Sequence, residues 1–196
     1  MEDSPRPLDP ALLERILVQA TTGPSDYNLQ PWRFLVVRDD RNRRRLRAAA
    51  WNRPEITRAP AVVIVLGYHF PVRSHLDPML EQAVAEGHCS PAKAAEIRGR
   101  AVAALGRIVD HELWATRSAM LAASRLMLAA DSLGVASTML EGFDADTLRR
   151  EFGIPDDHST CAVIALGHEA EPDSTPGRFG LDEVCYSEHF GQPWRA

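Results

Sequence analysis

Cysteines and long apolar runs are scarce in this chain of 196 residues. The three cysteines, Cys89, Cys161 and Cys185, stand far apart without a CxxC motif, which argues against a disulfide framework and a zinc site. No apolar run approaches the roughly 20 residues that cross a membrane. The first residues lack the basic-then-apolar order of a secretion signal. We therefore predict a cytoplasmic protein with no membrane partner.

The chain also lacks an excess of positive charge. Its net charge of −5 gives no general attraction to nucleic acid or to anionic lipid. The one basic run, RDDRNRRRLR at residues 38–47, is interrupted by Asp and Asn. We interpret this run as the solvated face of a helix, and we predict no nucleic-acid partner.

The common catalytic signatures are missing as well. The sequence contains no GxGxxG after a strand and no GxxxxGK[ST], GxSxG or HExxH motif. Among the seven histidines, only His75 approaches metal-ligand spacing, with Asp77 and Glu81, and we interpret this group as helix surface. We predict no metal site, and we expect the chemistry of an enzyme built on this chain to come from a bound cofactor.

What the chain does contain is an alternation of helix and strand signals. Capping residues and apolar periodicity predict helices at 10 to about 22, 41–50, 76–86, 91–108, 111–133 and 144–153. Short apolar or β-branched runs predict strands at 32–37, 61–68, 135–140 and 160–167. We predict one α+β domain over residues 1–196, in which helices outnumber strands.

Two segments indicate extensive packing, either within the chain or against a second subunit. The helix at 111–133 is apolar except for one narrow stripe, made by Arg117, Ser118, Ser124, Arg125, Asp131 and Ser132. A helix that is apolar on most sides is buried on most sides. Residues 168–196 form a polar tail that is too long for a bare connector. We expect this C-terminal extension to pack on the body or on a partner chain.

Three polar loops stand beside the predicted strands. PSDYNLQPW (24–32) precedes the first strand, Asn52 precedes the second, and Glu141-Gly142 follows the third. Ser25, Asn28 and Asn52 could hydrogen-bond the edge of a polar ring, and glycine lets a ligand approach the backbone closely. Such groups are typical of a cofactor pocket. The same residues are also typical of an Asx turn, a helix cap and a loop that ends a helix, and spacing alone leaves both interpretations open.

In this order, the motifs give the chain a resemblance to the nitroreductase family of FMN-dependent oxidoreductases. The matching positions span about residues 8–184 and are Pro24-Ser25, Asn28, Gln30-Pro31-Trp32, Asn52, Ala59-Pro60, Leu133-Gly134, Glu141-Gly142-Phe143-Asp144, Leu166-Gly167 and Arg178. The resemblance implies an α+β fold with an antiparallel or mixed sheet, assembled as an intertwined homodimer. It also implies two FMN sites at the interface, each lined by both chains, with the tail reaching the partner subunit.

The resemblance also implies roles for individual residues. Cofactor-binding positions are Ser25, Asp26, Asn28, Gln30, Asn52, Glu141, Gly142 and Arg178. Of these, Asn52 would face the pyrimidine edge of the flavin, the backbone of Glu141 and Gly142 would lie near its N5, and Arg178 would neutralise its phosphate. Glu141 is a weak candidate for direct proton transfer. The implied mechanism is ping-pong: NAD(P)H gives a hydride to the flavin, and an electron-poor acceptor such as a quinone or nitroaromatic then takes the electrons.

The phosphate-binding end departs from the family pattern. The basic motif that usually precedes the first helix is missing here, where only Arg6 stands among acidic residues. Three explanations stay open: a start site placed too late, substitution by Arg53, Arg58, Arg73 or Arg117, or weak flavin binding. The last gives the alternative function, a flavin-poor dimer that binds small molecules without reductase activity. Relatives of this fold also perform dehalogenation, azoline oxidation and flavin fragmentation, and the lid that would distinguish these is expected at residues 70–91.

Overall fold

A four-stranded antiparallel sheet organises the fold in the computed structural model, which describes residues 5–168 and 177–194. The strands are β1 (Trp32–Val37), β2 (Ala61–Tyr68), β3 (Ala136–Leu140) and β4 (His158–Gly167). Their order is β1-β2-β4-β3, so β1 and β3 are the two edges. Trp32 pairs with Gly67, and Leu140 pairs with Val163. The continuous apolar runs of β2 and β4 occupy the centre of the sheet, as expected for strands covered on both faces.

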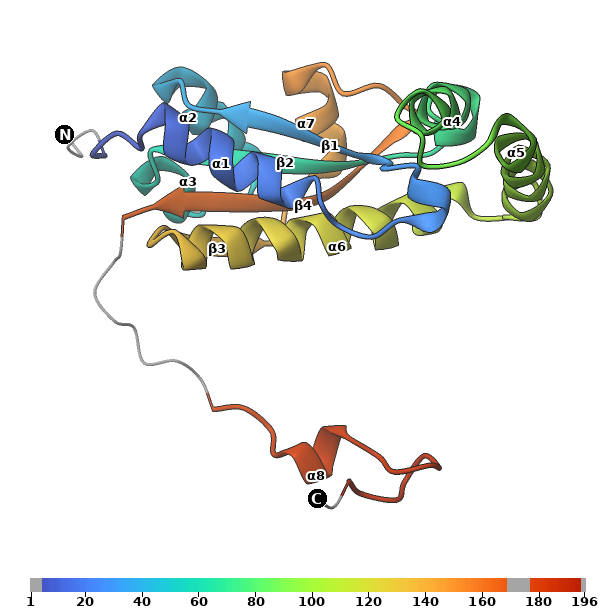
Figure 1. Ribbon diagram of the computed structural model, residues 1–196. Helices are drawn as coiled ribbons and strands as arrows, with labels where there is room; N and C mark the ends of the chain where they lie inside the picture. The colour runs from blue at the N-terminus through green and yellow to red at the C-terminus, as the bar shows by residue number, and fades with distance from the viewer. Residues whose placement is uncertain (1–4, 169–176, 195–196) are drawn as a thin grey trace.

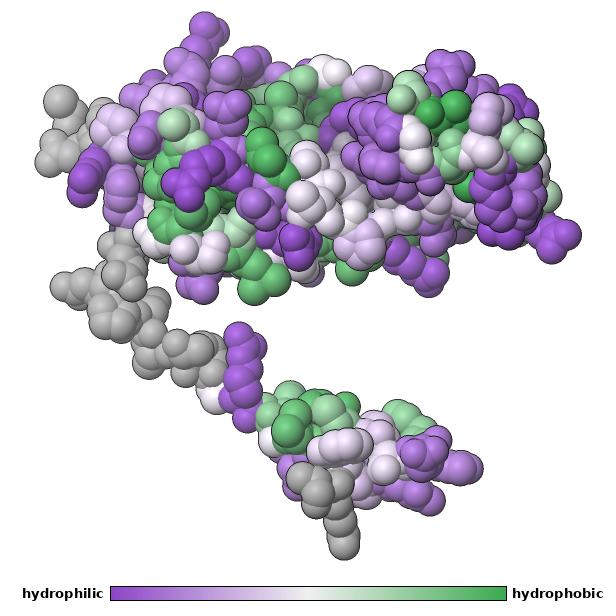
Figure 2. All heavy atoms as spheres, viewed as in Figure 1, coloured by the Kyte–Doolittle hydropathy of each residue, from purple (hydrophilic) through white to green (hydrophobic). Residues whose placement is uncertain are grey.

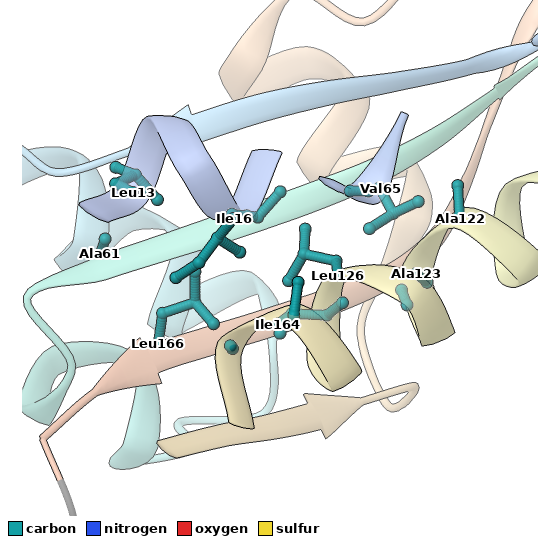
Figure 3. Packing of buried hydrophobic residues seen from close by; sticks show 14 of the residues in the cluster. Leu13, Ile16, Ala61, Val65, Ala122, Ala123, Leu126, Ile164 and Leu166 are labelled. Carbon is teal, nitrogen blue, oxygen red and sulfur yellow. The ribbon is translucent and has the colours of Figure 1, made fainter. Parts of the chain in front are cut away.

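Helices α1 (Pro10–Ala20) and α6 (His111–Ser132) cover one face of the sheet (Figure 1). Figure 3 shows their side chains pointing toward alternate residues of the central strands: Leu13 and Ile16 from α1, Ala122, Ala123 and Leu126 from α6, and Val65 and Ile164 from the sheet. The alanines of α6 and Gly67 of β2 allow close packing, because a Cβ at Gly67 would lie 3.0 Å from the backbone carbon of Ala115. The helix predicted at 111–133 is confirmed as α6, and its buried alanines pack against this face of the sheet.

Helices α2 (Asp40–Ala49), α3 (Glu55–Arg58) and α7 (Ala145–Phe152) cover the opposite face. The interpretation of the basic run at 38–47 as the solvated face of a helix is wrong for Arg43. Arg43 is only 4% exposed, and its guanidinium donates hydrogen bonds to the carbonyl oxygens of Thr57 and Ala59 and to Asp40. Those carbonyls belong to α3 and the turn after it, where a buried arginine satisfies backbone groups that would otherwise lack partners. The neighbouring Arg44 and Arg45 are exposed, as predicted.

Helices α4 (Leu76–Ala85) and α5 (Pro91–Leu105) form a hairpin beyond one end of the sheet (Figure 1). Its apolar cluster includes Leu76, Leu80 and Leu105, and it also takes in Leu29 from the loop before β1. A short 3-10 turn, η2 (Pro71–Arg73), joins β2 to α4. Because Leu29 packs in this cluster, the hairpin lies directly beside the loop at 24–32. Helix α4 falls within the 70–91 segment where we expect a lid, and α5 begins at the end of that segment.

The predicted elements are confirmed, with ends that differ by a few residues. Expected caps are in place: the side chains of Asp9, Ser90 and Asp144 accept hydrogen bonds from the first turns of α1, α5 and α7. The short helices α3 and α8 (Leu181–Val184) were not predicted. The hydrogen bonds found for residues 180–194 join this segment to itself, and Figure 1 draws α8 apart from the sheet. None of the described helices is long and apolar enough to cross a bilayer.

Candidate functional site

The loop that follows α1 has an unusual backbone. It contains the 3-10 turn η1 (Asp26–Asn28), and Tyr27, Asn28 and Gln30 adopt positive φ values of 51°, 56° and 46°. Such values are uncommon outside glycine, and for a bulky side chain they mark strain. Strained backbone persists where surrounding contacts enforce it, and it gathers at ligand-binding sites. The stretch that the sequence singled out is therefore a conformationally specialised loop.

Side chains from inside and outside the loop hold this conformation. Ser25 Oγ accepts a hydrogen bond from the backbone N–H of Gln30 at 2.9 Å, which closes the loop on itself. Asp26 accepts a hydrogen bond from the indole Nε1 of Trp114, on α6, at 3.0 Å. The side chain of Asn28 is exposed, whereas Leu29 is fully buried under the α4–α5 hairpin. Ser25 and Asp26 thus shape the loop, and Asn28 remains available to a ligand.

A cleft of about 930 Å³ opens beside this loop, between α1, the β1 edge and α4. Asn28, Gln30, Arg33 and His75 are among its lining residues. His75 Nδ1 lies 2.7 Å from the carbonyl oxygen of Leu29, which can only accept, so Nδ1 carries the proton and Nε2 accepts from Arg33. Burial lowers the pKa of His75, and the adjacent Arg33 guanidinium lowers it further. His75 is therefore held neutral beside a guanidinium that faces the cleft.

The other two predicted loops meet each other. Trp51 and Asn52, between α2 and α3, have φ values of 48° and 59°. The ring of Trp51 lies so close to Gly142 that a Cβ at Gly142 would be 2.5 Å from Cζ3 of the indole. Trp51 is 71% exposed, so it is no core aromatic within this chain. Glu141 and Asn52 are both exposed, and the contact between Trp51 and Gly142 brings the loop after α2 next to the loop after β3.

The predicted site residues consequently form two groups at opposite edges of the sheet. Residues 25–30 precede the edge strand β1, while Glu141 and Gly142 follow the edge strand β3. Strands β2 and β4 lie between the two edges, and neighbouring strands are about 4.8 Å apart. One copy of the chain does not bring the two groups into one pocket.

Comparison with known proteins identifies the family of this chain. The model of the Nitroreductase family matches residues 4–168. The chain belongs to the nitroreductase family. It is 33% identical over 178 residues to "NADH dehydrogenase" of Thermus thermophilus, a match covering 91% of this chain and 85% of that protein. It is also 27% identical over 182 residues to "Oxygen-insensitive NAD(P)H nitroreductase" of Enterobacter cloacae, covering 87% of this chain and 84% of the relative.

Solved structures show the same nitroreductase fold. A nitroreductase-like protein of Streptococcus mutans superposes with a TM-score of 0.85 at 23% identity, covering 93% of this chain and 89% of the other. A protein of Exiguobacterium sibiricum, solved in complex with FMN, superposes with a TM-score of 0.84 at 21% identity, covering 95% and 90%. The predicted fold is thereby confirmed, and the chain is an oxidoreductase of the nitroreductase type.

The residues present fit a flavin at its ring end. Short amide side chains, on Asn28 and Asn52, stand exposed on strained loops, and Glu141 is exposed after β3, next to Gly142 and the Trp51 ring that lies against it. The phosphate end is less complete among the described residues. Arg178 is exposed in the C-terminal segment, Arg53 is paired with Glu55, and Arg73 lies 4.3 Å from the centre of the Phe70 ring.

Three residues around the first loop were missed by the sequence reasoning for this role. No role at this loop was assigned to Trp114 or Arg33 from the sequence, and His75 was considered only as a metal ligand. In the structure His75 contacts Leu29 and Arg33, and Asp77 is paired with Arg98. Within residues 5–168 and 177–194, no cluster of His, Cys, Asp and Glu is suited to a metal ion. Contacts across 46 and 88 residues of sequence leave no local signal.

Proposed function

We propose that this protein is an FMN-dependent oxidoreductase that passes electrons from NAD(P)H to small electron-poor acceptors such as nitroaromatics or quinones. The observation that carries the proposal is the position of the strained backbone. Of the six non-glycine residues with positive φ in the described parts of the chain, five lie in the two loops expected to hold the flavin: Tyr27, Asn28, Gln30, Trp51 and Asn52. Such strain needs a functional reason, and a bound ring read by these loops supplies one.

FMN, when bound, supplies the redox chemistry, and this chain supplies positioning and electrostatics. Asn52 would hydrogen-bond the pyrimidine edge of the ring through its exposed amide. The backbone of Glu141 and Gly142 would contact the flavin ring, since Gly142 has no side chain. Asn28 would bind on the side of the FMN ribityl chain. Ser25, Asp26 and Gln30 would set the loop rather than contact the ring, because their side chains already make hydrogen bonds within the protein. Arg178 would pair with the phosphate.

A homodimer accounts for the separation of the two half-sites. The group at the β1 edge of one copy would join the group at the β3 edge of the other, so that each flavin is held by both chains. Exposed apolar side chains support an interface along α1 and α6: Val18, Leu121 and Leu128 are 55%, 48% and 66% exposed. Figure 2 shows hydrophobic side chains reaching the surface in this region. A groove of about 610 Å³ runs between the two helices.

The C-terminal extension, residues 168–196, would pack on the partner subunit. Its described part exposes Phe179, Leu181, Phe190 and Trp194, a set of apolar residues that needs a surface to cover it.

The edge strand β1 offers unpaired backbone groups beside the 930 Å³ cleft. We infer a ping-pong order in which NAD(P)H and the acceptor use this cleft in turn. The three cysteines are free, which agrees with a cytoplasmic location.

The test is an absorbance spectrum of the purified protein, before and after incubation with excess FMN and gel filtration. Flavin bands that stay with the protein and bleach under anaerobic NAD(P)H would support the proposal. A protein that stays colourless, yet elutes as a folded dimer, would overturn it. That second outcome would favour the flavin-poor alternative, for which the sparse cations at the phosphate end are the supporting observation.

A further inference from the structure

The loop at residues 25–30 accepts a hydrogen bond near each end from a side chain of another element. At its start, Trp114 in the first turn of α6 donates to Asp26 at 3.0 Å. At its end, His75, the residue that caps α4, donates from Nδ1 to the carbonyl oxygen of Leu29 at 2.7 Å. Between these two points lie Tyr27 and Asn28, and Gln30 follows, all with positive φ.

Hydrogen bonds within the loop hold part of its shape: besides the bond from Gln30 N–H to Ser25 Oγ, the Gln30 side-chain amide donates to the Asn28 carbonyl oxygen at 3.3 Å. Asn28 N–H donates to the Ser25 carbonyl oxygen at 3.0 Å and Leu29 N–H to that of Asp26 at 3.1 Å, which are bonds that an ordinary turn also makes. Three non-glycine residues in left-handed backbone raise the free energy of the loop relative to relaxed alternatives. Contacts from outside the loop add to these bonds: the indole of Trp114, the imidazole of His75, and the burial of Leu29 under the α4–α5 hairpin.

We propose that Trp114 and His75 are positioning residues that hold the loop at 25–30 in its ligand-binding conformation. The proposal rests on the proposed function for the identity of the ligand, FMN, but not for the mechanics of the loop. Trp114 belongs to α6 and His75 to the start of α4, so the position of the loop depends on the central helix and on the α4–α5 hairpin. A change in either helix would reach the site through these two hydrogen bonds.

The surroundings of His75 explain why an imidazole suits this position. Its Nε2 accepts from Arg33, whose guanidinium also donates to the Trp32 carbonyl oxygen at 2.8 Å, and the Tyr68 ring lies 5.5 Å away between centroids. A side chain that donates on one side and accepts on the other is needed between Leu29 and Arg33. Neutral histidine does both.

The first experiment measures amide hydrogen exchange of residues 25–30 in the flavin-free protein. Trp114→Phe removes the indole donor and keeps an aromatic ring, and His75→Leu removes the imidazole donor. Each should raise exchange at Asn28, Leu29 and Gln30 by about 10-fold, the effect of one lost hydrogen bond. His75→Asn should largely restore protection, because its amide N–H can reach the Leu29 carbonyl oxygen. Asp77→Asn, which breaks only the exposed pair with Arg98, is the control and should leave the loop unchanged.

The second experiment measures FMN affinity by fluorescence quenching. Trp114→Phe and His75→Leu should each raise the Kd about 10-fold. Asp26 is the exposed acceptor of the indole hydrogen bond, so Asp26→Ala should raise the Kd as much as Trp114→Phe does. Asp26→Asn retains an acceptor and should bind FMN better than Asp26→Ala.

Unchanged exchange and unchanged Kd in both Trp114→Phe and His75→Leu would overturn the positioning role while leaving the proposed function intact. If the wild type takes up no FMN, the proposed function fails, and the exchange measurement alone decides whether the two side chains fix the loop. A Kd that rises in Asp26→Ala but not in Trp114→Phe would also overturn the proposal, since Asp26 would then act on the ligand directly.

Discussion

Gly67 and Gly142 both lie against neighbouring residues, but only one of these neighbours is free to move. Replacing each glycine with alanine should therefore lower the free energy of unfolding by different amounts. A Cβ at Gly67 would lie 3.0 Å and 3.1 Å from the backbone carbon and oxygen of Ala115, on a helix that cannot move without repacking the core. A Cβ at Gly142 would lie even closer to Trp51, but that ring is exposed and can swing away.

We expect Gly67→Ala to lower the free energy of unfolding by about 1–3 kcal/mol, the usual cost of overpacking. Gly142→Ala should cost less than about 1 kcal/mol, yet it should weaken FMN retention, because the displaced indole and the new methyl group crowd the predicted flavin contact. Urea denaturation and gel filtration with FMN measure the two effects. Equal losses of stability at both positions, with flavin retention unaffected, would contradict this account.

At the same scale, residue type accounts for part of the unusual backbone of the two loops but not for all of it. Asn28 and Asn52 are residue types that tolerate left-handed φ, so a strained loop at these positions agrees with their identity. Tyr27, Gln30 and Trp51 do not favour it. For the loop at 25–30, we attribute this conformation to contacts such as the one between Trp114 and Asp26. Contacts between residues far apart in the chain do not appear in a single sequence.

Among the elements, helix α2 shows how two adjacent arginines come to have different roles. Arg43 is buried, and its guanidinium satisfies the Thr57 and Ala59 carbonyl oxygens and pairs with Asp40, whereas Arg44 is exposed. We expect Arg43→Met to lower the free energy of unfolding by about 1–3 kcal/mol, since it leaves buried carbonyls without a donor. Arg44→Met should change it by less than about 0.5 kcal/mol. Thermal or urea denaturation of both variants tests the difference, and similar curves for the two would show that Arg43 is dispensable.

The helices and strands themselves were largely predictable because their signals are local. Caps at Asp9, Ser90 and Asp144 and the apolar runs of β2 and β4 each act within a few residues of where they stand. The burial of Arg43 was not predictable in this way. It depends on where α3 presents its carbonyl oxygens, 14 and 16 residues further along the chain.

At the scale of the whole molecule, the division of the site follows from sheet order. The motifs come in a sequence order that suggests one continuous pocket, but β1 and β3 are the outer strands and hold the two groups apart. Sequence periodicity predicts that a strand exists, and it says little about which strands are neighbours. The resemblance to the nitroreductase family implied a site shared between subunits, and the separated half-sites give that implication a physical reason.

If two copies complete the site, then breaking their interface should also release the flavin. Leu128 is 66% exposed in the groove between α1 and α6, and Leu128→Glu places a charge there that must be desolvated on association. We expect this variant to weaken dimerisation by about 2 kcal/mol or more, the range of interface hot spots. Light scattering should find dimers for the wild type and monomers for the variant at the same concentration. Val109→Glu is the matched control, because Val109 is 98% exposed between α5 and α6 and lies outside that groove.

Flavin retention makes the same variants a test of how the site is built. A monomeric Leu128→Glu protein that remains folded should lose FMN on gel filtration, since each copy keeps only one group of contacts for each flavin. Saturating FMN should in turn shift the variant back toward dimers, because a ligand that binds only the assembled form stabilises it by mass action. A folded monomer that retains FMN as firmly as the wild type would mean that one chain suffices. The loops at the β1 and β3 edges would then have separate roles.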